Sequence, residues 1–170
     1  MQSDLSVLLI DMQEPYVRNI AHEERRTLVR SQMRTLLLCA KYDIPTIVLE
    51  YRGDGPTIEP LASAVRALPR HSRVEKSSRC AFFKTELHTI LRARRSGHLI
   101  VMGTNTSACV RDSVAGALRL GYGVSTSPDL IADPETKDCS DTVSTHAWLE
   151  RTICFHASLD RLLVFHGLHT

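Results

Sequence analysis

The chain alternates short apolar runs with longer segments of helical period, and this alternation limits the folds open to it. The runs span residues 5–10, 45–49 and 98–102, with weaker examples at 122–126 and 161–165. They are nearly continuous in aliphatic and β-branched residues, which is typical of strands buried on both faces of a parallel sheet. We therefore predict a strand at each of these places.

The segments between the runs place their apolar residues along one helical stripe. These predicted helices span residues 23–42, 85–95, 108–120 and 142–155, and Gly121 follows the third as a C-cap. Strands that alternate with helices predict an α/β fold with three αβα layers around a doubly wound, mainly parallel sheet. The less regular stretch 52–73 predicts a loop with one short helix over the functional site.

Length and composition fit one domain over residues 1–170 and argue against several other classes of protein. A net charge of +2 argues against nucleic-acid binding, since the densest basic cluster lies at the end of a predicted helix, at Arg92, Arg94 and Arg95. No stretch approaches the roughly 18 apolar residues of a membrane span, and the N-terminal run is too short for a signal peptide. The five cysteines include no CxxC pair, so we expect no disulfide framework, no zinc site and a cytoplasmic location.

Two reactive residues follow predicted strands. Asp11 comes directly after the first strand, and Cys109 follows the strand that ends at Met102, at the start of a helix. Ligands of open α/β sheets bind beyond the carboxyl ends of the strands, where the strand order reverses. If these two strands are neighbours at that point, Asp11 and Cys109 lie in one cleft.

Each candidate has a functional and a structural interpretation. Cys109 is either a nucleophile whose pKa is lowered by the helix N-terminus, with backbone N–H groups of the preceding turn as an oxyanion hole, or a small buried core residue. Asp11 is either the general base for the thiol or a structural ion-pair or capping residue. Lys76 is either the cation that stabilises both anions or a solvated surface lysine.

Three motifs together resemble the isochorismatase-like cysteine hydrolases, a family that includes nicotinamidases and N-carbamoylsarcosine amidases. The first is LLIDMQ at residues 8–13, around Asp11. The second is K-x4-A-F-x2-T-x-L, which begins at Lys76, and the third is G-x2-T-x2-C-V, which ends with Cys109 and Val110. The later GYGVSTSPD is also similar to the family pattern, and the order and spacing of the motifs extend the resemblance over nearly the whole chain.

The resemblance implies a Rossmann-like, six-stranded sheet and a catalytic triad of Asp11, Lys76 and Cys109. Asp11 would take the thiol proton, and the thiolate would attack a carbonyl carbon of a small-molecule substrate. The N–H groups of Asn105 and Cys109 would hold the oxyanion, and a cis peptide bond would join Thr104 to Asn105. The resemblance also implies a homo-oligomer, a dimer or a tetramer.

The sequence departs from the family at two places. The region after the second strand, LEYRGDGP, lacks the histidines of the nicotinamidase metal site, and His71 stands alone downstream. We therefore expect no metal, no other cofactor and a substrate other than nicotinamide. Thr104 and Asn105 replace an aliphatic and a small residue, and Asn105 either binds substrate or shapes the turn.

Further residues near the motifs are candidates for the substrate pocket: Gln13, Tyr16, Phe82 and Thr104. Arg18 and Arg52 either bind a substrate carboxylate or meet solvent. The leading hypothesis is a metal-free hydrolase of an amide or related C–N bond that acts through a thioester. The alternatives are a catalytically idle member that binds a small molecule or a protein, and a vinyl-ether hydrolase that uses Asp11 without Cys109.

Overall fold

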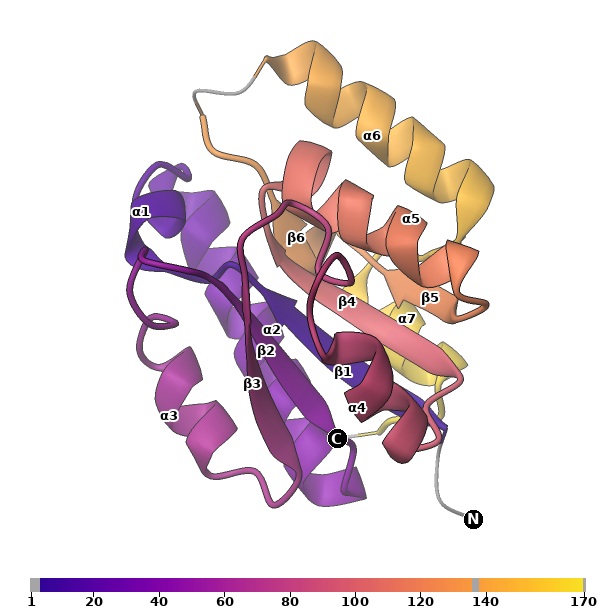
Figure 1. Ribbon diagram of the computed structural model, residues 1–170. Coiled ribbons are helices and arrows are strands. Elements are labelled where there is room, and N and C mark those ends of the chain that lie inside the picture. Colours follow the sequence, from indigo (N-terminus) through magenta and orange to yellow (C-terminus); the bar gives the residue numbers. More distant parts are fainter. Residues whose placement is uncertain (1–3, 136–137, 170) are drawn as a thin grey trace.

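A computed structural model describes residues 4–135 and 138–169, and Figure 1 shows an open parallel sheet between two layers of helices. The strand order is β3-β2-β1-β4-β5-β7, and β6 pairs with β4 outside this path to give a seventh strand. The strands are β1 Leu5–Ile10, β2 Thr46–Tyr51, β3 His71–Lys76, β4 His98–Thr104, β5 Gly123–Thr126, β6 Ile131–Ala132 and β7 Cys154–Phe155.

Helices cover both faces of the sheet (Figure 1). They are α1 Glu14–Val17, α2 His22–Tyr42, α3 Leu61–Arg66, α4 Leu87–Ala93, α5 Arg111–Arg119, α6 Cys139–Thr152 and α7 Leu159–Phe165, with a π-helical turn, η1, at Thr106–Val110 and a 3-10 turn, η2, at Pro128–Leu130. Helices α2 and α3 pack together on one face, whereas α6 contacts η1 on the other. None of the helices in the described ranges has the length and hydropathy of a membrane-spanning segment.

The strand order reverses between β1 and β4, as a doubly wound sheet requires. The chain runs from β1 outward through β2 to β3, then returns to β4 and continues to β5 in the other direction. Every residue of β1 is buried, because it is covered by helices on both faces and flanked by β2 and β4. The predicted neighbourhood of these two strands is confirmed, and the carboxyl ends of strands at such a reversal are where open α/β sheets bind ligands.

Four of the five predicted strands are present, and the fifth is wrong. Residues 161–165 belong to α7, where Leu159, Leu162 and Leu163 are buried at helical spacing and Ser158 caps the N-terminus. The strand β3 was missed because it is an edge strand with mostly polar, solvent-facing residues. The predicted helix at 142–155 ends at Thr152, so its last residues form β7 instead.

Gly103 allows β1 and β4 to approach closely at the reversal point. Its φ is +152°, and a Cβ atom at this position would lie 2.2 Å from the carbonyl oxygen of Ile10, its partner in the sheet. A side chain would therefore push the ends of the two strands apart. The glycine keeps Asp11, which follows β1, and Thr104, the last residue of β4, side by side.

Candidate active site

Three predicted site residues meet at the carboxyl ends of the strands. Asp11 follows β1, Lys76 is the last residue of β3, and Cys109 lies in η1 after β4. Because β2 separates β3 from β1, the Lys76 side chain crosses β2, where its Nζ lies 4.5 Å from the centre of the Tyr51 ring. The aromatic face stabilises the ammonium group along this path.

Asp11 and Lys76 form a buried ion pair. Lys76 Nζ lies 2.9 Å from Asp11 Oδ2, neither side chain is exposed, and Nζ also donates to the carbonyl oxygen of Ser78. The second carboxylate oxygen, Asp11 Oδ1, is buried without a hydrogen-bond partner among the described residues. Burial raises the pKa of Asp11 above its usual value, although the Lys76 charge opposes the shift.

The Cys109 thiol is buried beside this pair, with a relative exposure of 6%. Burial and the negative charge of Asp11 raise the pKa of Cys109 to about 12, and the positive charge of Lys76 opposes them. The pKa of Cys109 is thus raised, not lowered as expected, and desolvation by burial is the first cause. Cys109 is therefore a neutral thiol near pH 7, beside the Asp11 carboxylate, whose Oδ1 atom has no hydrogen-bond partner among the described residues.

The turn before Cys109 differs from the expected one in its backbone geometry. Residues 106–110 form a π-helical turn that continues directly into α5, so Cys109 lies in the first turn of a helical segment, as predicted. Asn105 has left-handed backbone angles, and its carbonyl oxygen accepts from the N–H groups of Ala108 and Val110. The predicted cis bond between Thr104 and Asn105 is wrong, since the cis peptide within the described ranges joins Glu59 to Pro60.

Asp133 holds this turn in place, and sequence reasoning missed it. Its carboxylate accepts from both the N–H and the hydroxyl of Ser107 at 3.1 Å and from the hydroxyl of Thr142 in α6 at 2.8 Å. It is almost fully buried. The available signal was the same as for Asp11: a carboxylate directly after a short apolar strand.

Two of the predicted pocket residues, Gln13 and Thr104, use their side chains for hydrogen bonds within the protein. The Gln13 amide is fully committed to backbone groups of Tyr51 and Gly55, and the Thr104 hydroxyl donates to the carbonyl oxygen of Asp11. Both residues shape the site. Phe82 stacks on Tyr122, with 5.9 Å between ring centres, and no described contact joins it to Cys109.

Tyr16 is half-buried, and its hydroxyl donates to Asp54 in the loop after β2. Burial, Asp54 and the charges of Asp11 and Cys109 all raise the pKa of Tyr16. Arg18 is exposed, and the exposed Arg52 pairs with Glu75.

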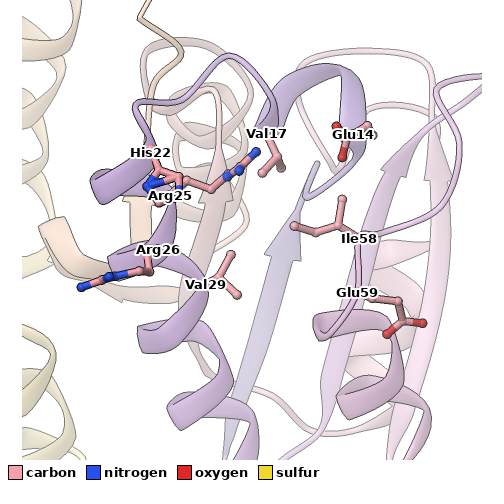
Figure 2. Close-up of a pocket in the computed structure, with 8 residues that line it drawn as sticks. All are labelled: Glu14, Val17, His22, Arg25, Arg26, Val29, Ile58 and Glu59. Atoms are coloured by element: carbon pink, nitrogen blue, oxygen red, sulfur yellow. The ribbon is translucent and has the colours of Figure 1, made fainter.

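A cavity of about 340 Å³ lies between α1, the first turns of α2 and the segment before α3 (Figure 2). It is lined by Glu14, Val17, His22, Arg25, Arg26, Val29, Ile58 and Glu59. Figure 2 shows Arg25 extending from α2 toward α1, whereas Arg26 points away. Asp11, Lys76 and Cys109 are not among its lining residues.

Within residues 4–135 and 138–169, no three His, Cys, Asp or Glu side chains are arranged to hold a metal ion, so the described residues offer no metal site. The Nδ1 atom of His71 lies 2.8 Å from the carbonyl oxygen of Leu68.

Comparisons with known proteins bear on the family and the fold of the chain. The model of the isochorismatase domain matches residues 6–147. No curated protein sequence matches the chain.

Several solved structures share the fold. An isochorismatase-like hydrolase of Alkaliphilus metalliredigens has a TM-score of 0.78 and 17% identity over 95% of this chain and 98% of that one. A nicotinamidase of Staphylococcus aureus has a TM-score of 0.75 and 16% identity over 91% of this chain and 99% of that one. A ribonuclease of Caenorhabditis elegans has a TM-score of 0.80 and 18% identity over 98% of this chain and 82% of that one.

Proposed function

The chain belongs to the isochorismatase domain family, whose members are hydrolases, and we propose that it cleaves an amide or related C–N bond of a small molecule through a thioester at Cys109. The observation that carries the proposal is the buried ion pair of Asp11 and Lys76 beside the Cys109 thiol. A buried charge pair is costly to maintain, and a nucleophile next to a desolvated base is what acyl transfer requires.

The first half of the reaction forms the thioester. Asp11 Oδ1 accepts the thiol proton as the sulfur attacks the carbonyl carbon, since this oxygen has no competing hydrogen bond. The raised pKa of Asp11 makes it a stronger base than an exposed carboxylate. The N–H groups of Asn105 and Cys109 receive the developing oxyanion, and Lys76 offsets the negative charge.

The second half releases the products. The tetrahedral intermediate collapses, the C–N bond breaks, and Asp11 returns the proton to the leaving amine. Water then loses a proton to Asp11 and attacks the thioester carbon. The acid product leaves as the Cys109 sulfur takes back the proton.

Replacement of Cys109 tests this mechanism. Cys109→Ala abolishes turnover of a panel of small amides while substrate binding is retained, and intact-mass spectrometry of the wild-type protein detects an acyl adduct. Cys154→Ala is the control, because that thiol is exposed and distant in sequence from the turn. Retained hydrolysis in Cys109→Ala would favour ether hydrolysis by Asp11, and absence of turnover with every substrate would favour a binding protein.

The homo-oligomer and the cytoplasmic location stay predictions. Light scattering coupled to gel filtration measures the first: a mass of two or four times 19.0 kDa agrees with a dimer or tetramer.

A further inference from the structure

Two half-buried polar side chains belong to the segments that follow the neighbouring strands β1 and β2. Tyr16 comes from α1, Asp54 comes from the loop after β2, and the Tyr16 hydroxyl donates to Asp54 Oδ2. The Asp54 charge contributes to the raised pKa of Asp11, and the charges of Asp11 and Cys109 contribute to that of Tyr16. Tyr16 N–H also donates to the carbonyl oxygen of Gln13, two residues after Asp11, and the ring of Tyr51, three residues before Asp54, lies 4.5 Å from Lys76 Nζ. The Tyr16–Asp54 pair is therefore anchored to the same strand ends as the triad.

The loop that carries Asp54 is held against the end of β1. Gln13 Nε2 donates to the carbonyl oxygens of Tyr51 at 2.9 Å and Gly55 at 2.5 Å, and Gln13 Oε1 accepts from Tyr51 N–H at 2.7 Å. Gly53 and Gly55 on either side of Asp54 have φ values of +88° and +83°, which lets the loop fold back. These contacts give Asp54 a defined position instead of leaving it on a free loop.

The charges around this position do not balance. The Lys76 ammonium is engaged by Asp11. The neighbouring Arg52 is 69% exposed and pairs with Glu75. Within the described part of the chain, the Asp54 carboxylate bonds to Tyr16 and forms no ion pair. The segments beside the triad thus carry the negative charge of Asp54, which no described ion pair compensates, and the phenol oxygen of Tyr16.

We propose that Tyr16 and Asp54 form the specificity-determining entrance to Cys109, which favours substrates that carry a cationic or N–H-rich group and disfavours substrates that carry a carboxylate. The inference rests on the proposed function only in taking Cys109 as the reacting group. Asp54 attracts the cation by Coulomb interaction and accepts its hydrogen bonds, whereas an anionic group is repelled by a half-buried carboxylate that forms no ion pair within the described residues. The alternative in which Arg18 or Arg52 binds a substrate carboxylate predicts the opposite charge preference.

Charged thiol reagents test the entrance without requiring turnover. Methanethiosulfonates with a trimethylammonium-ethyl, a methyl or a sulfonatoethyl group label Cys109, and peptide mass spectrometry gives the rate at that residue. Rates are divided by those at the exposed Cys154 in the same sample. We expect the cationic reagent to label Cys109 faster than the anionic one in the wild-type protein.

Asp54→Asn should reduce the cationic-to-anionic rate ratio by about tenfold, because one unit charge near the site is worth on the order of one such factor. Glu59→Gln is the matched control: Glu59 belongs to the same loop region but is 59% exposed and paired with Arg66, so the ratio should not change. Tyr16→Phe keeps the charge of Asp54 and should keep the preference for the cation. Asp54→Ser serves as a second variant if Asp54→Asn is unstable.

An unchanged ratio in the Asp54 variants, or faster anionic labelling in the wild-type protein, would overturn the proposal. The two proposals fail separately. A charge preference that depends on Asp54 in a protein that hydrolyses no amide would refute the proposed function and support the entrance. Hydrolysis that depends on Cys109, with labelling indifferent to Asp54, would do the reverse.

Discussion

The ammonium nitrogen of Lys76 lies 2.9 Å from a carboxylate oxygen of Asp11, and neither side chain is accessible to solvent. Each of the two buried charges is therefore stabilised mainly by the other. Removal of one partner leaves an unpaired buried charge, which costs about 3–5 kcal/mol.

We expect Lys76→Met to lower the free energy of unfolding by about this amount, measured by urea denaturation. The double variant Asp11→Asn, Lys76→Met should recover much of the loss, since no unpaired charge remains. Lys41→Met is the control, because Lys41 is exposed. A double variant less stable than Lys76→Met would contradict the assignment of the pair.

The reactivity of Cys109 should rise with pH well into the alkaline range, because burial and Asp11 raise its pKa to about 12. Asp11→Asn removes the negative charge that raises this pKa, so the thiol pKa falls and iodoacetamide labels Cys109 faster at pH 8. The measurement is the labelling rate by peptide mass spectrometry between pH 6 and 10. Slower labelling in Asp11→Asn would mean that Asp11 promotes the free thiolate instead of holding the thiol neutral.

Asp133→Ala should loosen the turn that carries Cys109. The variant loses the acceptor of Ser107 N–H, Ser107 hydroxyl and Thr142 hydroxyl, at a cost of about 3 kcal/mol in the free energy of unfolding. Hydrogen exchange at residues 105–110 should accelerate. Asp138→Ala is the matched control: it removes only the N-cap of α6, worth about 1 kcal/mol, and should leave exchange in the turn unchanged.

Acid should destabilise the protein at a pair of histidines, His98 and His166, which lie where α7 packs against the sheet. The Oγ atom of Ser125 lies 2.7 Å from His98 Nε2 and 3.1 Å from His166 Nε2, and the two rings are 4.9 Å apart. Burial lowers the pKa of His98, and burial with the neighbouring His98 lowers that of His166 to about 4.

A histidine with a depressed pKa binds fewer protons when folded than when unfolded, so its contribution to stability is present above about pH 6.5 and is lost as the pH falls toward 4. The melting temperature should therefore drop across this window. His166→Gln should flatten the drop, whereas His22→Gln should not, since His22 is largely exposed. Identical pH profiles for the wild-type protein and His166→Gln would exclude the pair as the cause.

The local sequence pattern correctly predicted most strands of the sheet, but it assigned one helical segment, residues 161–165, to a strand. Runs such as residues 5–10 and 98–102 are apolar on both faces, and burial in a parallel sheet is the ordinary outcome of that pattern. Residues 161–165 are equally apolar, but the chain places Leu159, Leu162 and Leu163 on one helical face. A short apolar run alone does not distinguish a strand from a buried helix.

The sequence by itself determined the α/β winding and the positions of Asp11 and Cys109 after their strands, because periodicity and the strand–helix alternation are local properties. The resemblance to the family implied a triad with Lys76, but tertiary structure alone decided that this side chain reaches Asp11, 65 residues away, across β2, and that Asp133 supports the turn from the end of a separate strand. It also decided that the Cys109 pKa is raised, since desolvation depends on every group packed around the thiol. Such placements arise from contacts between distant segments, which no local pattern encodes.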